Sequence, residues 1–174
     1  MRAHLLVLGA VTACGLGKGS VDAEWQVAGE RHEVTTEGAA GWCAASGMIL
    51  VEGTEGDRAV GVHWHYDSLA PAVHQLEPPT SADSAVTGAS AAIRYVHLDE
   101  VRGYRSLAGE LTVRAIDSAT VSGSVTAVMH RVGESDTTVL AMTFDRVPLV
   151  ADSTLCVAPK AAPDTLAPTP ATEP

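Results

Sequence analysis

The stretch GELTVRAIDSATVSGSVTAVM, residues 109–129, decides the fold class. In its first half, apolar residues such as Leu111 and Val113 alternate with polar ones, the period of two expected for a β-strand with one buried face. A short polar segment, 117–120, then leads into a second extended run, 121–132. Two such runs joined by a short turn predict consecutive antiparallel strands.

The same alternation extends outward in both directions. It is clearest in VGVHWHY, residues 60–66, and in the run around Leu140, Met142 and Phe144. Further strands are expected at 46–51 and 91–98 and one or two at 25–36, with a helical turn at 99–106 and a long irregular loop at 77–90. The sequence therefore predicts an all-β fold, a single antiparallel β-sandwich of about seven or eight strands, with a closed lipocalin-like barrel as the alternative.

Composition limits the classes of function. The 174 residues include 11 Lys and Arg against 21 Asp and Glu, a formal net charge of −10, and hydrophobic residues make up 46%. That apolar fraction is too high for a disordered protein, and the length suits one domain. Because an acidic surface repels phosphate groups, we expect no nucleic-acid partner.

The N-terminal residues carry an export pattern. A single Arg2 precedes a mainly apolar run, 5–12, which ends in Val11-Thr12-Ala13-Cys14. Eight residues rise only about 12 Å as a helix, too little to cross a hydrocarbon core of about 30 Å. The run is therefore a signal segment or, alternatively, a first strand.

Val11-Thr12-Ala13-Cys14 resembles the lipobox of bacterial lipoproteins. The resemblance implies that residues 1–13 are a removed signal peptide and that Cys14 is acylated and anchors the protein to a membrane. In Gram-negative members an Asp directly after the cysteine retains the protein in the inner membrane. Gly15 stands there, so the resemblance implies sorting to the outer membrane or cell surface.

Composition divides the rest of the chain into three parts. We expect a Gly-rich tether at 14–21, a β-rich domain at 22–157 and a disordered tail rich in Pro, Thr and Ala at 158–174. Residues 109–129, with the TTVLAMTFDRVPL run at 137–149, also loosely resemble uncharacterised exported bacterial β-domains. That resemblance implies no activity.

Two cysteines remain beyond Cys14, namely Cys43 and Cys156. In an exported chain an even pair suggests one disulfide, here closing a loop of about 110 residues. Two buried free thiols are the alternative.

Histidines at alternate positions of the 60–66 run form the main candidate for chemistry. His63 and His65 would project from one face, about 6–7 Å apart, where both could ligate one metal ion. A third ligand would have to come from His97, Asp99, Glu100 or His32. The alternative is a solvated pair, since Val62 and Trp64 claim the buried face.

Aromatic and basic residues provide two weaker candidates. Arg102 and Arg105, near Tyr104, could form a small patch for an anionic ligand, or simply a solvated face. At least two of the three tryptophans should fill the core, because the sequence contains one Phe.

Together these features predict a monomeric, lipid-anchored envelope protein with a binding or structural role. We expect no enzyme activity, no catalytic residue and no cofactor. A carrier of a small apolar ligand is the first alternative, and a metal-binding protein or metalloenzyme using His63 and His65 is the second.

Overall fold

The computed structural model describes residues 18–66, 68–78 and 88–156. The expected signal peptide 1–13, the acylated Cys14 and the tail 158–174 lie outside these residues. The described chain consists of ten strands and one 3-10 turn: β1 Ser20–Val27, β2 Glu30–Glu37, β3 Ala39–Cys43, β4 Met48–Glu55, β5 Arg58–His65, β6 Ala72–Leu76, β7 Ala89–His97, β8 Glu100–Ile116, β9 Thr120–Arg131, β10 Thr137–Ala151 and η1 Ser153–Leu155.

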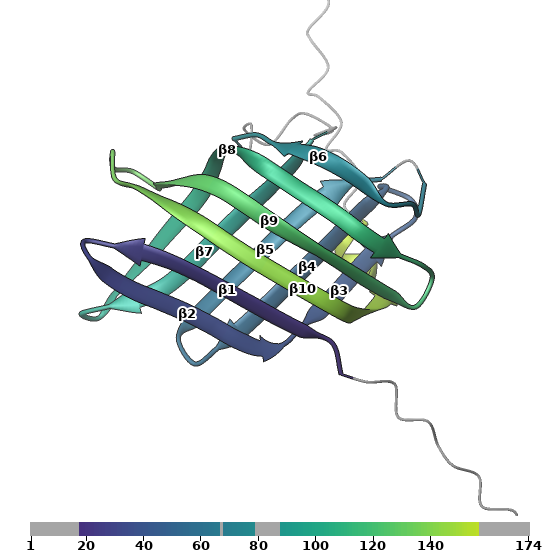
Figure 1. Ribbon diagram of the computed structural model, residues 1–174, viewed down its shortest axis with the longest axis horizontal. Helices are drawn as coiled ribbons and strands as arrows, with labels where there is room; N and C mark the ends of the chain where they lie inside the picture. The colour runs from purple at the N-terminus through teal and green to yellow at the C-terminus, as the bar shows by residue number, and fades with distance from the viewer. Residues whose placement is uncertain (1–17, 67, 79–87, 157–174) are drawn as a thin grey trace, which may run out of the picture.

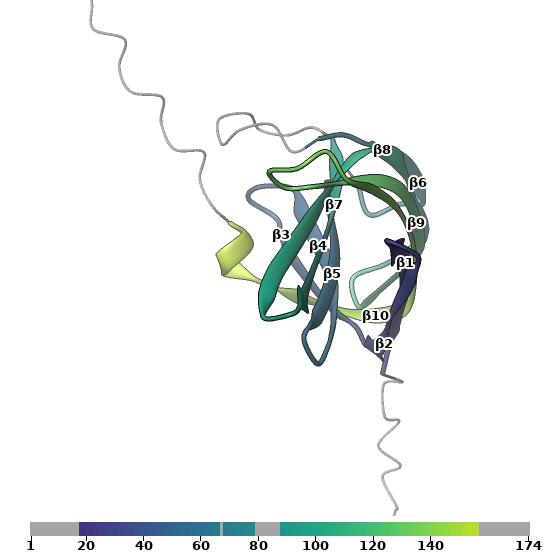
Figure 2. The ribbon, with the colours of Figure 1, turned by 90° about the vertical axis from the view of Figure 1, so that its left-hand side faces the viewer.

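The strands form two layers around one core, and the expected all-β, sandwich-like fold is confirmed. Strands β3, β4, β5 and β7 make up one layer, and β1, β2, β6, β8, β9 and β10 the other (Figures 1 and 2). Hydrogen bonding links all ten into one mixed sheet in the order β2-β1-β10-β3-β4-β5-β7-β6-β8-β9, and additional pairings join β9 to β10 and β7 to β8. Most pairings are antiparallel, and β3 joins β10 in parallel.

Two long strands connect the layers. The first part of β8 pairs with β7 and its later part with β6. Strand β10 pairs with β9 and β1 in its own layer, and its last residues, 149–151, pair with β3 in the other. Register shifts interrupt both strands, at 106/108 and 113/115 in β8 and at 144/147 in β10. Such bulges bend a strand, which allows one strand to serve both layers.

Several local expectations need correction. The helical turn expected at 99–106 is not formed. Leu98 and Asp99, with φ of 50° and 66°, form a tight turn, and β8 begins at Glu100 and pairs with β7. Strands β3 and β6, each of five residues, raise the number of strands above the expected seven or eight. Strand β1 begins at Ser20, inside the segment expected to be a tether.

Strands β8, β9 and β10 form the meander expected from residues 109–129 and 137–149. Leu111, Val113, Leu140, Met142 and Phe144 are all buried, as the alternation predicted. Ala115 is the exception, because the bulge after Val113 turns it outward. A one-residue shift moves every following side chain to the other face of a sheet.

Strand β2 lies at an edge of the sheet, and side chains from the opposite layer form hydrogen bonds with its unpaired backbone groups. The Glu55 carboxylate accepts a hydrogen bond from the Thr35 N–H at 3.2 Å, and Arg58 donates to the Glu33 carbonyl at 3.1 Å. Glu55 is the last residue of β4 and Arg58 the first of β5, so both bonds come from the end of this hairpin in the opposite layer. These bonds satisfy part of an exposed backbone edge and close the sandwich along one side.

Candidate functional site

The two histidines of β5 lie on one face of the strand, as expected, but each already contacts the protein. His63 Nε2 is 3.1 Å from Ser90 Oγ, and His65 Nδ1 is 3.1 Å from the Ser46 carbonyl. Both rings are half-buried. Burial, followed by the charge of His65, lowers the pKa of His63. These contacts hold both rings in place on the outer face of the sheet.

The residues considered as a third metal ligand lie elsewhere. Ser90 faces His63 across β5 and β7, and His97 lies seven residues further along β7, about 23 Å away in an extended strand. Asp99 and Glu100 follow His97 at the same distant turn, and His32 is buried in the core. Within the described ranges, no three His, Cys, Asp or Glu side chains are grouped so that they could hold a metal ion.

The expected disulfide between Cys43 and Cys156 is present and connects β3 to the residue after η1. Its Cα atoms are 5.4 Å apart, and its cysteines are 113 residues apart in sequence. The Asp152 N–H donates to the Trp42 carbonyl at 2.9 Å, which aligns the two segments. The Asp152 carboxylate accepts bonds from the hydroxyl and N–H of Thr154, and these lower its pKa.

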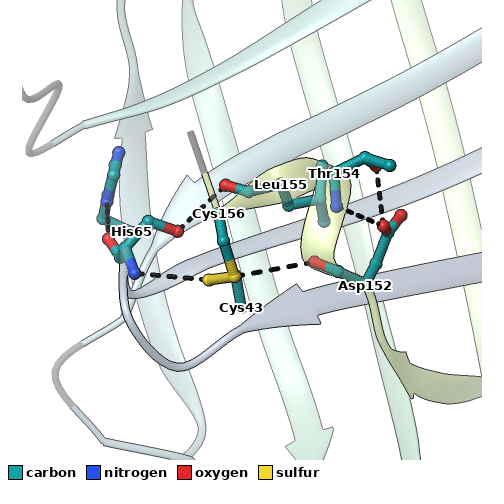
Figure 3. Close-up of a disulfide and its surroundings, with 7 residues drawn as sticks. Cys43, His65, Asp152, Thr154, Leu155 and Cys156 are labelled. Atoms are coloured by element: carbon teal, nitrogen blue, oxygen red, sulfur yellow. Dashed lines mark hydrogen bonds between the residues drawn. A yellow bond between two sulfur atoms is a disulfide. The ribbon is translucent and has the colours of Figure 1, made fainter. Parts of the chain in front are cut away.

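The Cys43–Cys156 disulfide lies near His65 (Figure 3). Hydrogen bonds of Ser46 link the two. Its N–H contacts Cys43 Sγ at 3.4 Å, its hydroxyl donates to the Leu155 carbonyl at 3.1 Å, and its carbonyl meets His65. The surroundings of His65 therefore belong to the anchoring of the C-terminal end of the domain.

A cluster that the sequence did not indicate lies between the layers. We name Trp25, His32, Tyr95 and Tyr104 the aromatic cluster. His32 stacks on Trp25 with ring centroids 5.5 Å apart and packs against Tyr95 at 4.6 Å, while Tyr95 stacks on Tyr104 at 6.2 Å. All four side chains are buried, and His32 is only 5% exposed. The cluster joins the β1–β2 hairpin to the β7–β8 hairpin.

Three polar atoms of the aromatic cluster have no hydrogen-bond partner. They are Trp25 Nε1 and the hydroxyls of Tyr95 and Tyr104, and they are the only such buried side-chain atoms among the residues described. Burial and the nearby Tyr95 hydroxyl raise the pKa of Tyr104 to about 12. Burial also lowers the pKa of His32, and the positive charges of Arg58, His97 and Arg102 add to that effect, against an opposing contribution from Glu30.

The candidate basic patch around Tyr104, the weaker of the two readings of these residues, is divided between two faces. Tyr104 is buried, and Arg102, two positions earlier on the same face, has a side chain only 20% exposed and pairs with Glu100 at 3.3 Å. Arg105 is exposed on the opposite face. The patch fails because these residues form a strand, where neighbours point to opposite sides, instead of a helical turn.

A hollow of about 580 Å³ lies beside β1 and β10, close to the aromatic cluster. It is lined by Glu24, Trp25, Gln26, Arg31, Thr138, Val139 and Ala141. Regular pairing of β1 with β10 stops here, at Trp25 and Leu140. Beyond that point the Thr138 hydroxyl bonds to the N–H and carbonyl of Gln26, at 3.3 and 2.6 Å. The hollow therefore marks a break in backbone pairing next to Trp25.

Comparison with protein families, curated proteins and solved structures finds no match for this chain. No helix in the described part of the chain is long and apolar enough to span a membrane.

Proposed function

We propose that this chain is an exported, lipid-anchored binding module of the cell envelope, held at the outer membrane or cell surface through acylated Cys14. The observation that supports export is the Cys43–Cys156 disulfide, because structural disulfides persist in oxidising compartments and are rare in the cytosol. The Val11-Thr12-Ala13-Cys14 motif supplies the site of the anchor. Two or more acyl chains would hold the domain stably on a membrane.

A binding role, with no enzyme activity, suits the side chains in the described part. His63 contacts Ser90, but that serine is only 4% exposed, so its hydroxyl is poorly placed to meet a substrate. His65 serves the disulfide region through Ser46. Buried polar groups are usually hydrogen-bonded, and Trp25 Nε1 in the aromatic cluster has no such partner.

Detergent phase separation tests the anchor. The full chain, expressed in a bacterial host with lipoprotein processing, should enter the detergent phase, and Cys14→Ser should move it to the aqueous phase. The matched control is Cys43→Ala with Cys156→Ala, which removes the disulfide and leaves Cys14 in place. If Cys14→Ser still enters the detergent phase, the anchor is refuted.

A further inference from the structure

We propose that a small pocket with aromatic walls, at the end of the fold where β5 and β8 finish, is occupied by a proline of this chain's own C-terminal segment, residues 157–174. The inference assigns an occupant to a site that the proposed function does not use, and it does not depend on the anchor at Cys14. It starts from the lining of the pocket and from the place where the described chain ends.

The pocket has a volume of about 150 Å³, and we name it the Trp64 pocket. It lies where three strands begin or end: Trp64 is near the end of β5, Ala72 begins β6 and Ile116 is the last residue of β8. Its lining also includes Tyr66, Pro71 and His74. An apolar cavity of about this volume can hold one small ring. The Trp64 pocket therefore has room for a single cyclic side chain.

Packing already holds the aromatic rings of the Trp64 pocket. Trp64 is 1% exposed, stacks against Phe144 with ring centroids 6.5 Å apart, and lies 6.4 Å from the His74 ring. Tyr66 meets Trp42 edge to face, with centroids 6.5 Å apart. Because these rings are fixed before anything binds, a ligand restricts few further side-chain rotations. A weak apolar contact is therefore enough to fill the pocket.

A proline ring suits this lining, and segment 157–174 supplies several. Proline-rich segments bind to grooves lined by aromatic side chains, and the fixed φ of proline lowers the entropy lost on binding. Proline also has no N–H, so its burial leaves no backbone donor without a partner. The segment has prolines at positions 159, 163, 168, 170 and 174.

The described chain ends at the same end of the fold as the Trp64 pocket. The Ser46 hydroxyl donates a hydrogen bond to the Leu155 carbonyl at 3.1 Å. The carbonyl of the next residue, Gly47, accepts one from the Tyr66 N–H at 2.8 Å. The disulfide fixes Cys156 next to these contacts (Figure 3). Segment 157–174 therefore starts close to the Tyr66 wall of the pocket.

Chain length favours the first prolines of the segment. An extended polyproline chain rises about 3.1 Å per residue, so Pro159 and Pro163 can lie up to about 9 and 22 Å from Cys156. Such a short connection keeps the effective concentration of these prolines near the pocket in the millimolar range. A segment too poor in large apolar residues to form a core can therefore still place one ring in a preformed pocket. Pro174, at the end of the segment, has a longer connection and a lower effective concentration.

Nuclear magnetic resonance of the ¹⁵N-labelled, disulfide-bonded full chain tests the proposal, with Cys14→Ser so that the protein stays free of lipid. The amides of residues 160–164 should show heteronuclear NOE values close to those of the strands, because docking restricts their motion on the nanosecond timescale. Pro159→Ala with Pro163→Ala should reduce these values to those of a free chain and shift the Trp64 indole N–H signal. Pro174→Ala is the matched control and should change neither.

A variant of the pocket tests the same contact from the other side. Ala72→Leu narrows the Trp64 pocket and should release the segment, whereas Val73→Leu, on the opposite face of β6, should leave it bound. The proline variants lie outside the ten strands, so they test the contact without altering the fold.

Three outcomes would contradict the proposal. Free-chain NOE values for residues 160–164 in the chain with all its prolines overturn it, and so does an unshifted Trp64 signal in the double proline variant. Tenfold dilution should leave the NOE values unchanged, because the contact lies within one chain. A fall on dilution means that a second copy supplies the proline, which overturns the assignment to the same chain.

Discussion

Removing the Cys43–Cys156 disulfide should lower the free energy of unfolding more than any single hydrogen bond near it. The cysteines are 113 residues apart, so the cross-link closes the chain from the end of β3 to the residue after η1 into one loop. For that loop length, the chain-entropy relation gives about 4.8 kcal/mol at 25 °C. Residual structure in the unfolded chain reduces the figure, and we expect a loss of about 3–5 kcal/mol.

Urea unfolding followed by tryptophan fluorescence measures this loss, because Trp25 and Trp64 are buried and report on the core. The comparison is between the oxidised chain and Cys43→Ala with Cys156→Ala, both carrying Cys14→Ser so that no stray thiol remains. Alanine suits position 43, which is 2% exposed.

A local variant separates the cross-link from its surroundings. Ser46→Ala in the oxidised chain removes the bond to the Leu155 carbonyl and should cost only about 1 kcal/mol. If the double cysteine variant loses less than about 1 kcal/mol, or no more than Ser46→Ala, the loop-closure argument is wrong.

Two further predictions concern pH and packing. Burial lowers the pKa of His32 and His63 below 6.5, so at a pH near or below 6.5 the unfolded chain binds more protons than the folded one. The free energy of unfolding should therefore decrease as pH falls below 6.5. The decrease should be at most about 1.4 kcal/mol per pH unit for each histidine. Urea titrations between about pH 7.5 and 5 measure this slope, and a flat profile would contradict it. Gly123→Ala should cost about 1–3 kcal/mol in urea unfolding, because its Cβ would lie 2.5 Å from Phe144 Cζ. Gly61→Ala, whose Cβ meets nothing closer than 3.5 Å, is the matched control and should change stability by less than about 0.5 kcal/mol.

Local alternation predicted the burial of most strand residues correctly. Leu111, Val113, Leu140 and Phe144 are all in the core, as residues 109–129 and the following run indicated. Successive side chains of a strand point to opposite faces, so the alternation of apolar and polar neighbours in the sequence indicates which face is buried. The alternation of Val62 and Trp64 with His63 and His65 likewise placed the histidines on the opposite face from the core.

The aromatic cluster was missed because its members are distant in sequence. Trp25 and His32 are direct partners in the register of β1 with β2. Tyr95 and Tyr104 are diagonal neighbours on β7 and β8. Trp25, His32 and Tyr95 fell in segments expected to be strands, and Tyr104 in the segment expected to be a helical turn. The absence of hydrogen-bond partners for three of their polar atoms is a property of packing between layers, which no local pattern contains.

The sequence by itself determined the all-β class, the meander of 109–129 with its following strand, and the pairing of the two cysteines other than Cys14. These follow from local periodicity and from counting, and need no knowledge of distant contacts. Tertiary structure decided that Ala115 points outward, that Arg102 and Arg105 are separated, and that the layers share two strands. Bulges and strand registers set these features, and both depend on long-range pairing, in which a shift of one residue reverses the face of every side chain that follows.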